Sequence, residues 1–405
     1  MTDSSKSENI DLYNPDNYVD ALPTAAMDRL RSECPVFRHP HPDGGDYWLL
    51  TRHADVVAVS RDHRTFSSER GFVMVDDLPD DILEQVRSQL LGMDPPRHGP
   101  IRRLVISRFT KSMLAQMEPR VRELCRDIFA RPEARGDCDF VDDVAGRLPT
   151  AVIGEMMGVP PDMWEQMRIW SDMQTSGDDP DLGASAEEIQ QASIEMGSYG
   201  YQLACERREQ GGDDLTSLLV NVEVDGEKIS EIEFASLFVQ ITVAGNETTR
   251  GLIAGGMQQL IEQPELYREL EQNPQAIPAA VEEMLRFCCP LHYFRRTATA
   301  DTAIGEQPVA ENDRVVMMYS AANRDPEVFR DPHRFDITRQ DNPHLAFGYG
   351  IHLCLGANLA RLEARVFFEE FFRAYAGIES LGPVRRIRSN MVNGPKAMPV
   401  RLQRR

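Results

Sequence analysis

The feature that most constrains the fold of this chain is a long helical pattern that begins at Ser230 and ends before Pro264. Ser230 and Glu233 form a capping box, in which a hydroxyl and a carboxylate satisfy the free amides at a helix start. Apolar residues then recur at helical spacing until Pro264, which cannot continue the helix. About thirty residues at about 1.5 Å each span about 45 Å. The pattern therefore predicts a helix that crosses a whole domain, and apolar residues on more than one of its faces predict that it is buried.

A polar cluster, Ala-Gly-Asn-Glu-Thr-Thr at residues 244–249, interrupts the apolar pattern in the middle of this helix. Gly245 costs about 1 kcal/mol relative to Ala in a helix interior, and an unpaired buried Glu247 would cost far more. A threonine hydroxyl also competes for the backbone bonds of a helix and bends it. One interpretation is a solvent-facing patch at a surface kink. The other is a ligand-facing notch in which Glu247 and Thr248 transfer protons.

A second unusual segment, Phe347–Gly356, places Cys354 directly before a helical pattern that starts near Ala357. The positive end of a helix lowers the pKa of a thiol, so the sequence predicts a thiolate that acts as a metal ligand or a nucleophile. The segment does not fit a dinucleotide-binding loop, because position 353 lacks the required third glycine.

Few kinds of site use a single cysteine in this position. Zinc would need about four ligands, and only His352 and Cys354 lie close together here. A cysteine protease would need a base and an orienting residue, which the sequence does not locate. The remaining option is one axial thiolate on a haem iron.

These segments resemble motifs of the cytochrome P450 superfamily. Phe347–Gly356 resembles the haem-thiolate signature FGxGxHxCxG, and residues 244–249 resemble the oxygen-activating helix motif. Glu283–Arg286 matches the ExxR motif and Pro332–Phe335 the PxRF segment, all in the family's order along essentially the whole chain. The resemblance implies a cytochrome P450 fold, with haem between the long central helix and the cysteine-bearing loop.

The remaining patterns agree with a mainly α fold that has a small β portion. Residues from about 95 to 285 and from about 357 to 375 are chiefly helical in pattern, whereas 47–51 and 314–318 are typical of strands. No repeat or low-complexity linker divides the chain. We therefore expect residues 1–405 to form a single domain.

The resemblance also implies the residues that bind haem b. Cys354 is implied as the iron ligand, and the partners of the two propionates are implied to be His98, Arg102, Arg296 and His352. His98 and Arg102 stand four residues apart, which places them on one helical face. Glu283, Arg286 and Arg334 resemble a structural Glu-Arg-Arg network that fixes the cysteine loop.

The implied activity is that of a monooxygenase, which inserts one oxygen atom from dioxygen into a C–H bond. Thr248 is the implied oxygen-side hydroxyl, and Glu247, where many relatives carry Asp, relays protons from water. The alternatives are a peroxygenase or ring-forming haem-thiolate enzyme, and a non-catalytic haem or gas-binding protein. The segments that match substrate-contacting regions of the family are mostly apolar: 72–78, 170–173, 240–244, 291–293 and 391–393. They favour a hydrophobic small molecule of terpenoid, steroid or branched-lipid type.

The charge balance limits the partners of the chain. With 65 acidic and 44 basic residues, its net charge is −21, which disfavours nucleic acid and anionic membranes. No signal peptide or spanning segment is visible, and 7 cysteines are typical of a reduced cytoplasmic protein. We expect a monomer that receives electrons from a ferredoxin and its NAD(P)H-dependent reductase, since no flavin or iron–sulfur module is recognisable. The segment 100–111 carries Arg102, Arg103, Arg108 and Lys111, and with Arg102 facing a propionate, Arg103 and Arg108 line a hypothetical basic docking site for that ferredoxin.

Overall fold

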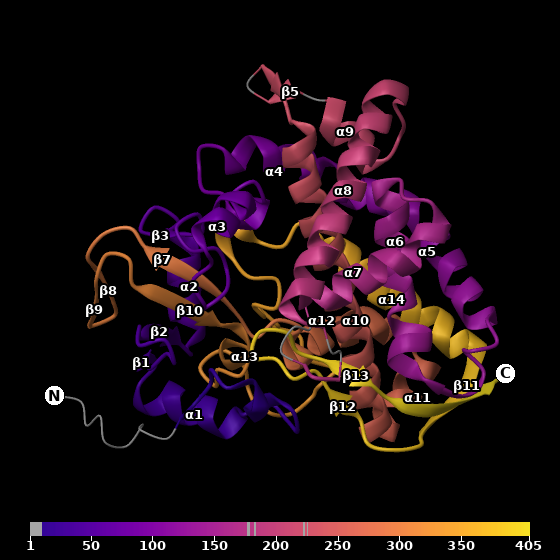
Figure 1. Cartoon of the computed structure of the whole chain (residues 1–405). Helices are drawn as coiled ribbons and strands as arrows, with labels where there is room; N and C mark the ends of the chain where they lie inside the picture. The colour runs from indigo at the N-terminus through magenta and orange to yellow at the C-terminus, as the bar shows by residue number, and fades with distance from the viewer. Residues whose placement is uncertain (1–9, 176–178, 182–183, 222, 225) are drawn as a thin grey trace.

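The computed structural model describes residues 10–175, 179–181, 184–221, 223–224 and 226–405. It is mainly α-helical with a smaller β portion, which confirms the predicted fold class (Figure 1). The helices are α1 (Thr24–Glu33), α2 (His53–Arg61), α3 (Asp80–Val86), α4 (His98–Ile106), α5 (Lys111–Ala130), α6 (Arg147–Met157), α7 (Trp164–Thr175), α8 (Ala186–Gln210), α9 (Leu215–Asn221), α10 (Glu231–Glu262), α11 (Pro264–Gln272), α12 (Ile277–Cys288), α13 (Tyr319–Ala322) and α14 (Ala357–Ala374).

The strands are short and form one group at one side of the molecule and smaller groups elsewhere, one of them beside the C-terminus (Figure 1). They are β1 (Val36–His39), β2 (Tyr47–Leu50), β3 (Phe66–Ser67), β4 (Gly136–Asp139), β5 (Glu223–Val224), β6 (Glu227–Lys228), β7 (Tyr293–Ala298), β8 (Thr302–Ile304), β9 (Gln307–Val309), β10 (Arg314–Met318), β11 (Tyr375–Ser380), β12 (Arg385–Arg386), β13 (Pro395–Ala397) and β14 (Pro399–Arg404).

The long central helix is α10, and it has the predicted bounds. The Ser230 hydroxyl accepts from the Glu233 amide, and the Glu233 carboxylate accepts from the Ser230 amide. The helix ends at Glu262, directly before Gln263 and Pro264. It packs against α6, α7, α8, α12 and α14, so several of its faces are buried as its apolar pattern predicts. Among the described residues, no helix combines the length and apolar character that crossing a membrane requires.

The largest sheet joins segments that are far apart in the sequence. Its strand order is β1-β2-β10-β7-β3, and its indigo and orange strands lie side by side in Figure 1. The two predicted strands, β2 and β10, are parallel neighbours in it. Strand β7 pairs antiparallel with β10 on one side and with β3 on the other. Because successive side chains of a strand point to opposite faces, Arg295 and Arg296 on β7 serve different sides of the sheet.

Candidate active site

Cys354 lies in a tight loop three residues before α14. The loop is held by a hydrogen bond from the Cys354 amide to the Phe347 carbonyl, 2.9 Å long, and the Arg102 guanidinium donates to the Leu353 carbonyl. Gly350 has a φ of +75°, and a Cβ there would come within 2.1 Å of the Ser60 carbonyl oxygen. Only glycine fits this position, which explains why the motif requires it.

The electrostatic environment of Cys354 differs from the sequence-based expectation. The side chain is accessible, yet protein atoms surround it closely, and this desolvation raises the pKa of the thiol. The amides of Gly356 and Ala357 at the helix start lower the pKa, as do the charges of Arg102 and Arg361, but these contributions are smaller. The expected net lowering of the pKa is therefore wrong for the free protein.

The residues implied to bind the propionates come together from three separate elements. The rings of His98 on α4 and His352 lie 4.5 Å apart between centroids. Burial and the charge of Arg102 lower the pKa of His98 to about 4, and burial and the charge of Arg296 lower the pKa of His352. Both imidazoles are therefore neutral near pH 7, and each offers a ring N–H donor.

The two arginines, Arg102 and Arg296, make this a cationic cluster, on which the negative charge of Asp94 acts through His98 and Arg296 without forming an ion pair. Arg296 is buried, and its guanidinium donates to the Arg295 carbonyl at 2.7 Å, while Nε2 of His98 is buried without a partner. Within the described ranges no carboxylate forms an ion pair with Arg102 or Arg296. A buried guanidinium requires an anion, and Arg296 is buried beside the half-buried Arg102 and two ring N–H donors, so the cluster fits a group with two carboxylates beside Cys354, as haem has.

His63 is a further member of this cluster that the sequence analysis missed. Its Nδ1 is buried without a partner, and its charge contributes to lowering the pKa of both His98 and His352. His63 follows α2 in the chain and belongs to none of the family motifs, so the sequence offers no signal for it.

The middle of α10 has two distinct faces. Ala244 is exposed and Thr248 half-buried, although most of the helix is buried, and the Thr248 hydroxyl donates to the Ala244 carbonyl at 2.8 Å. The predicted competition of a hydroxyl with the helix backbone is therefore present. Gly245 faces α6, where a Cβ would come within 3.2 Å of the Ile153 side chain. This glycine serves close helix packing.

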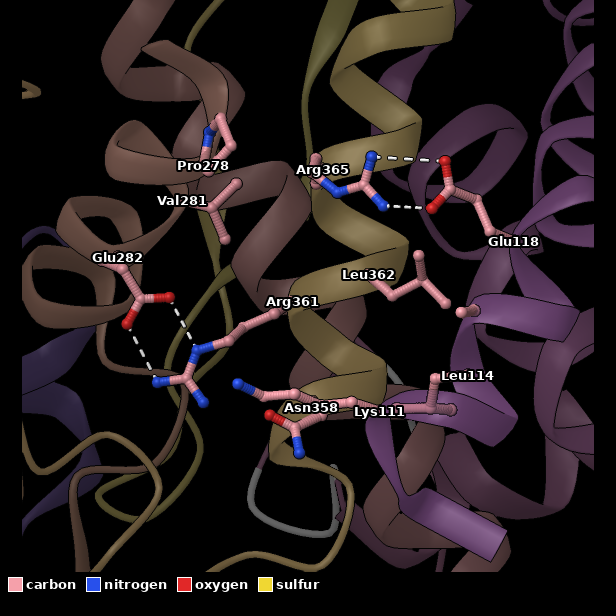
Figure 2. A pocket seen from close by; sticks show the side chains of 11 residues that line it. Lys111, Leu114, Glu118, Pro278, Val281, Glu282, Asn358, Arg361, Leu362 and Arg365 are labelled. Atoms are coloured by element: carbon pink, nitrogen blue, oxygen red, sulfur yellow. Dashed lines mark hydrogen bonds and ion pairs between the residues drawn. The ribbon is translucent and has the colours of Figure 1, made fainter. Parts of the chain in front are cut away.

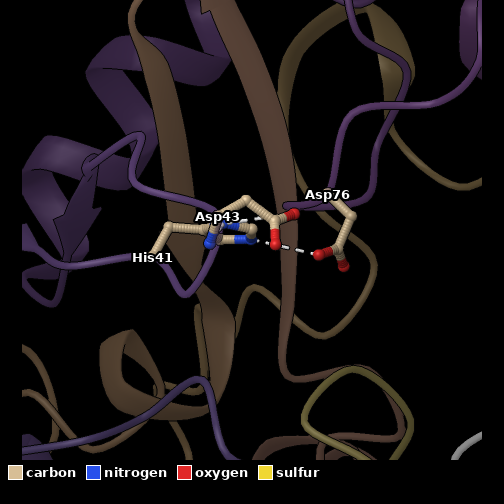
Figure 3. Close-up of side chains that lie close together, drawn as sticks. All are labelled: His41, Asp43 and Asp76. Atoms are coloured by element: carbon tan, nitrogen blue, oxygen red, sulfur yellow. Dashed lines mark hydrogen bonds and ion pairs between the residues drawn. The ribbon is translucent and has the colours of Figure 1, made fainter.

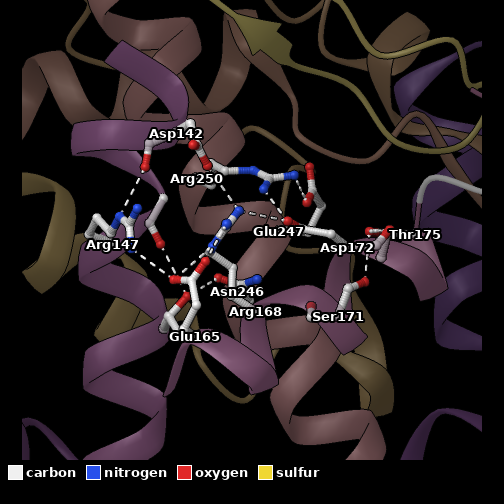
Figure 4. Close-up of polar contacts among 12 residues, drawn as sticks. Asp142, Arg147, Glu165, Arg168, Ser171, Asp172, Thr175, Asn246, Glu247 and Arg250 are labelled. Atoms are coloured by element: carbon white, nitrogen blue, oxygen red, sulfur yellow. Dashed lines mark hydrogen bonds and ion pairs between the residues drawn. The ribbon is translucent and has the colours of Figure 1, made fainter. Parts of the chain in front are cut away.

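Glu247 lies on the buried face of α10 and forms an ion pair with Arg250, one helical turn later (Figure 4). Arg250 also binds Asp172 of α7 at 2.8 Å. Arg250 was not among the predicted site residues, and Asp172 was included only as part of the predicted substrate-contacting segment 170–173. The spacing of three residues between Glu247 and Arg250 was a sequence signal for this ion pair. No sequence pattern indicated that the distant Asp172 binds Arg250.

The predicted Glu-Arg-Arg network needs one correction. Glu283 and Arg286 are fully buried and form an ion pair with an N–O distance of 2.7 Å. The third side chain is that of Arg339, which contacts Glu283 at 3.1 Å. Arg334 is exposed and supplies only its backbone carbonyl, which accepts from Arg286 at 3.0 Å. Placing the Arg334 side chain in the network was therefore wrong.

The hypothetical basic docking site is divided by the structure. Arg103 is exposed on α4, and Lys111 at the start of α5 lines a groove of about 300 Å³ between α5, α12 and α14 (Figure 2). On the α14 side of that groove, Arg361 and Arg365 turn toward Glu282 and Glu118. Arg108, however, lines a separate groove with methionines of α5 and α6. Arg108 therefore does not share the α14-side groove with Lys111.

A His-Asp cluster elsewhere anchors a predicted substrate-contacting segment, residues 72–78. Nε2 of His41 is 3.0 Å from the Asp76 carboxylate, and its Nδ1 accepts from the Asp43 amide at 3.2 Å (Figure 3). With both nitrogens hydrogen-bonded, this histidine has no free ligand atom for a metal. The Arg295 guanidinium holds the same segment through Asp77 at 2.7 Å.

Comparisons with known proteins agree with this geometry. A family model described as cytochrome P450 matches residues 188–378. The steroid C26-monooxygenase of Rhodococcus jostii (strain RHA1) is 36% identical, over 97% of this chain and 84% of its own length. The linalool 8-monooxygenase of Pseudomonas putida is 34% identical over 97% of this chain and 98% of its own. A methyl-branched lipid omega-hydroxylase of Mycobacterium tuberculosis is 37% identical over 94% and 91% of the two chains.

Solved structures show the same similarity in three dimensions. The Mycobacterium marinum cytochrome P450 CYP268A2, in complex with pseudoionone, superposes with a TM-score of 0.88 at 36% identity, covering 93% of this chain and 94% of the other. CYP108D1 of Novosphingobium aromaticivorans superposes with a TM-score of 0.86 at 30% identity, and 97% of each chain is covered.

Proposed function

Since this chain belongs to the cytochrome P450 family and is a monooxygenase, we propose that it hydroxylates a hydrophobic small molecule of terpenoid, steroid or branched-lipid type. The observation that carries the proposal is the accessible surface of Ala244 and Thr248 on a helix that is otherwise largely buried. Relatives named for steroid, linalool and methyl-branched lipid oxidation support the substrate class.

The cofactor of the proposal is haem b, which when bound supplies the reductive activation of dioxygen. Cys354 would hold its iron, and His98, Arg102, Arg296 and His352 would neutralise and hydrogen-bond its propionates. We include a monomeric state and a cytoplasmic location in the proposal, the latter supported by cysteines that are all free thiols.

The proposed role of Thr248 is to hold a proton at its hydroxyl oxygen on the substrate side of α10. In the structure this hydroxyl donates to the Ala244 carbonyl, so its oxygen lone pairs remain available to accept from water. Glu247, on the adjacent helix position, would bring protons from water to Thr248. The protein thus separates the proton-delivering side of α10 from the side on which the substrate lies.

The function is tested by a ligand screen followed by turnover. Terpenoids, steroids and branched fatty acids are screened for displacement of water from the ferric iron, and each ligand found is incubated with ferredoxin, reductase and isotopically labelled dioxygen. We expect a hydroxylated product that carries one labelled oxygen atom. Product formed only with added hydrogen peroxide would instead favour a peroxygenase, and absence of turnover with every ligand would favour a non-catalytic protein.

Thr248→Ala is expected to uncouple the reaction in the same assay. Loss of a positioned proton carrier typically costs about 10²–10⁴-fold, so product falls steeply while reductant is still consumed and peroxide appears. Thr249→Ala is the matched control, because Thr249 is buried on another face of the same helix. Unchanged product per reductant in Thr248→Ala would exclude the proposed role.

We propose that electrons arrive from a ferredoxin at the surface formed by α4, the start of α5 and α14. Arg103→Glu combined with Lys111→Glu is expected to weaken ferredoxin-driven turnover and reduce its dependence on salt, because opposite charges steer association. Arg108→Glu reverses one charge in the separate groove and serves as the control for each of the two single reversals, Arg103→Glu and Lys111→Glu. Equal effects of Arg108→Glu and of the two single reversals on the ferredoxin KM would contradict this surface.

A further inference from the structure

A chain of alternating charges connects Glu247 to α7. The Glu247 carboxylate binds Arg250, Arg250 binds Asp172 with an N–O distance of 2.8 Å, and Asp172 binds Arg168 at 3.0 Å (Figure 4). The side chains are 3% exposed at Glu247, 8% at Arg250 and 18% at Asp172. The chain of charges therefore leads from the interior toward solvent, and its three inner members are largely removed from water.

Arg250 is the shared element of this arrangement. One terminal nitrogen of its guanidinium serves Glu247 and the other serves Asp172, while its Nε is buried without a partner. Two carboxylates therefore divide the charge of one buried cation. In a poorly hydrated site such interactions are strong, so a change in charge on one carboxylate alters how tightly Arg250 holds the other.

Asp172 is the carboxylate that can change its charge near neutral pH. Burial raises its pKa to about 6; the charge of Arg250 opposes this increase and the charge of Glu247 adds to it. Arg168 on its own helix also lowers the pKa of Asp172. Asp142 and Glu165 lie one step further out and contact Arg168.

We propose that Asp172 is a positioning residue for proton delivery, because its carboxylate competes with Glu247 for the Arg250 guanidinium. This inference rests on the proposed monooxygenase function and concerns the regulation of the same site. When Asp172 is ionised, Arg250 is shared and Glu247 is free to leave it toward Thr248. When Asp172 is neutral, Arg250 binds Glu247 alone, which holds the Glu247 side chain on the buried face and keeps its carboxylate from turning toward Thr248.

The direction in which proton delivery changes with pH distinguishes this positioning role from that of a simple proton carrier. A carrier with a pKa near 6 would deliver protons better as the pH falls. Asp172 instead restricts Glu247 as the pH falls, because loss of the negative charge of Asp172 leaves Arg250 to Glu247 alone and strengthens the Glu247–Arg250 pair. Asp172→Asn mimics the neutral state at every pH.

The first arm of the test is infrared difference spectroscopy of the haem-loaded protein during a pH titration, which needs no turnover. We expect a protonated carboxyl band that titrates near pH 6 and is lost in Asp172→Asn. In Glu247→Gln the titration moves to lower pH, because a neighbouring negative charge is removed. Glu165→Gln is the matched control: it lies on the same helix and contacts Arg168 and Arg147 rather than Arg250.

The second arm measures the share of reductant that ends as peroxide across the same pH range. We expect this share to rise in the native protein as Asp172 is protonated, and to be high and independent of pH in Asp172→Asn. Product formation in Asp172→Asn is expected to fall about tenfold, because Arg250 then holds Glu247 at every pH and proton delivery is slowed.

Three results would overturn the inference: a band near pH 6 that persists in Asp172→Asn, a titration that Glu247→Gln does not move, or a peroxide share in Asp172→Asn that follows the native pH profile. If the asparagine variant does not fold, the native and Glu247→Gln titrations still decide the question. Failure of the monooxygenase proposal would appear differently, as absence of labelled product while the carboxyl titrations behave as stated.

Discussion

Replacing Cys354 by histidine is expected to abolish the strongly red-shifted absorption band that the ferrous protein forms with carbon monoxide. The band depends on electron donation from a thiolate to the iron, and an imidazole nitrogen does not supply it. The measurement is a difference spectrum of the reduced protein with and without carbon monoxide. Oxygen insertion into substrate should be lost in the same variant.

Cys205→Ser provides the control for this substitution. Cys205 is also a free, partly accessible cysteine, but it lies on α8 and far from the haem motif in sequence. Its replacement should leave the band unchanged. A normal band in Cys354→His would show that another residue is the iron ligand, and the site proposed around the loop would then have to be abandoned.

Arg286→Met is expected to destabilise the protein by about 3–5 kcal/mol, the usual cost of removing one member of a buried ion pair. Besides Glu283, the Arg286 guanidinium satisfies the carbonyls of Asn323, Pro332 and Arg334 at 2.8–3.0 Å. The variant leaves these acceptors without their donor and Glu283 with a reduced set of partners. We expect a lower denaturant midpoint and a lower ratio of haem to protein.

The corrected network supplies matched controls for this prediction. Arg334→Ala removes an exposed side chain and should change stability by no more than about 0.5 kcal/mol. Arg339→Ala removes a guanidinium that contacts Glu283, and its effect should lie between the two. Equal losses in Arg334→Ala and Arg286→Met would contradict the structural assignment.

Local signals in the sequence were sufficient for much of the fold. The ends of α10 follow from a capping box and a proline, both of which act within one helical turn. Strands β2 and β10 follow from short β-prone runs of residues. That these two strands pair in parallel could not be predicted, because the partners lie more than two hundred residues apart in the chain.

The predicted site residues came from sequence motifs. The predictions were wrong where the contacts of a side chain depend on tertiary packing. The sequence placed Arg334 in the network, but the chain turns so that Arg339 reaches Glu283 instead. It predicted a lower thiol pKa at Cys354 from the helix end alone, whereas burial dominates. The partner of Arg250 on α7 required knowledge of which helices touch.

Arg295 and Arg296 are neighbours on β7, so the register between β7 and β10 determines which face of the sheet each side chain occupies. Arg296 belongs to the cationic cluster, and Arg295 holds the segment that carries Asp77. A slip of one residue between β7 and β10 would exchange the faces of these side chains. The alignment with Val315 and Val316 on β10 therefore ties the proposed propionate-binding cluster to the predicted substrate-contacting segment 72–78 through a single ladder of hydrogen bonds. A shift of this strand would therefore displace both arginines at once.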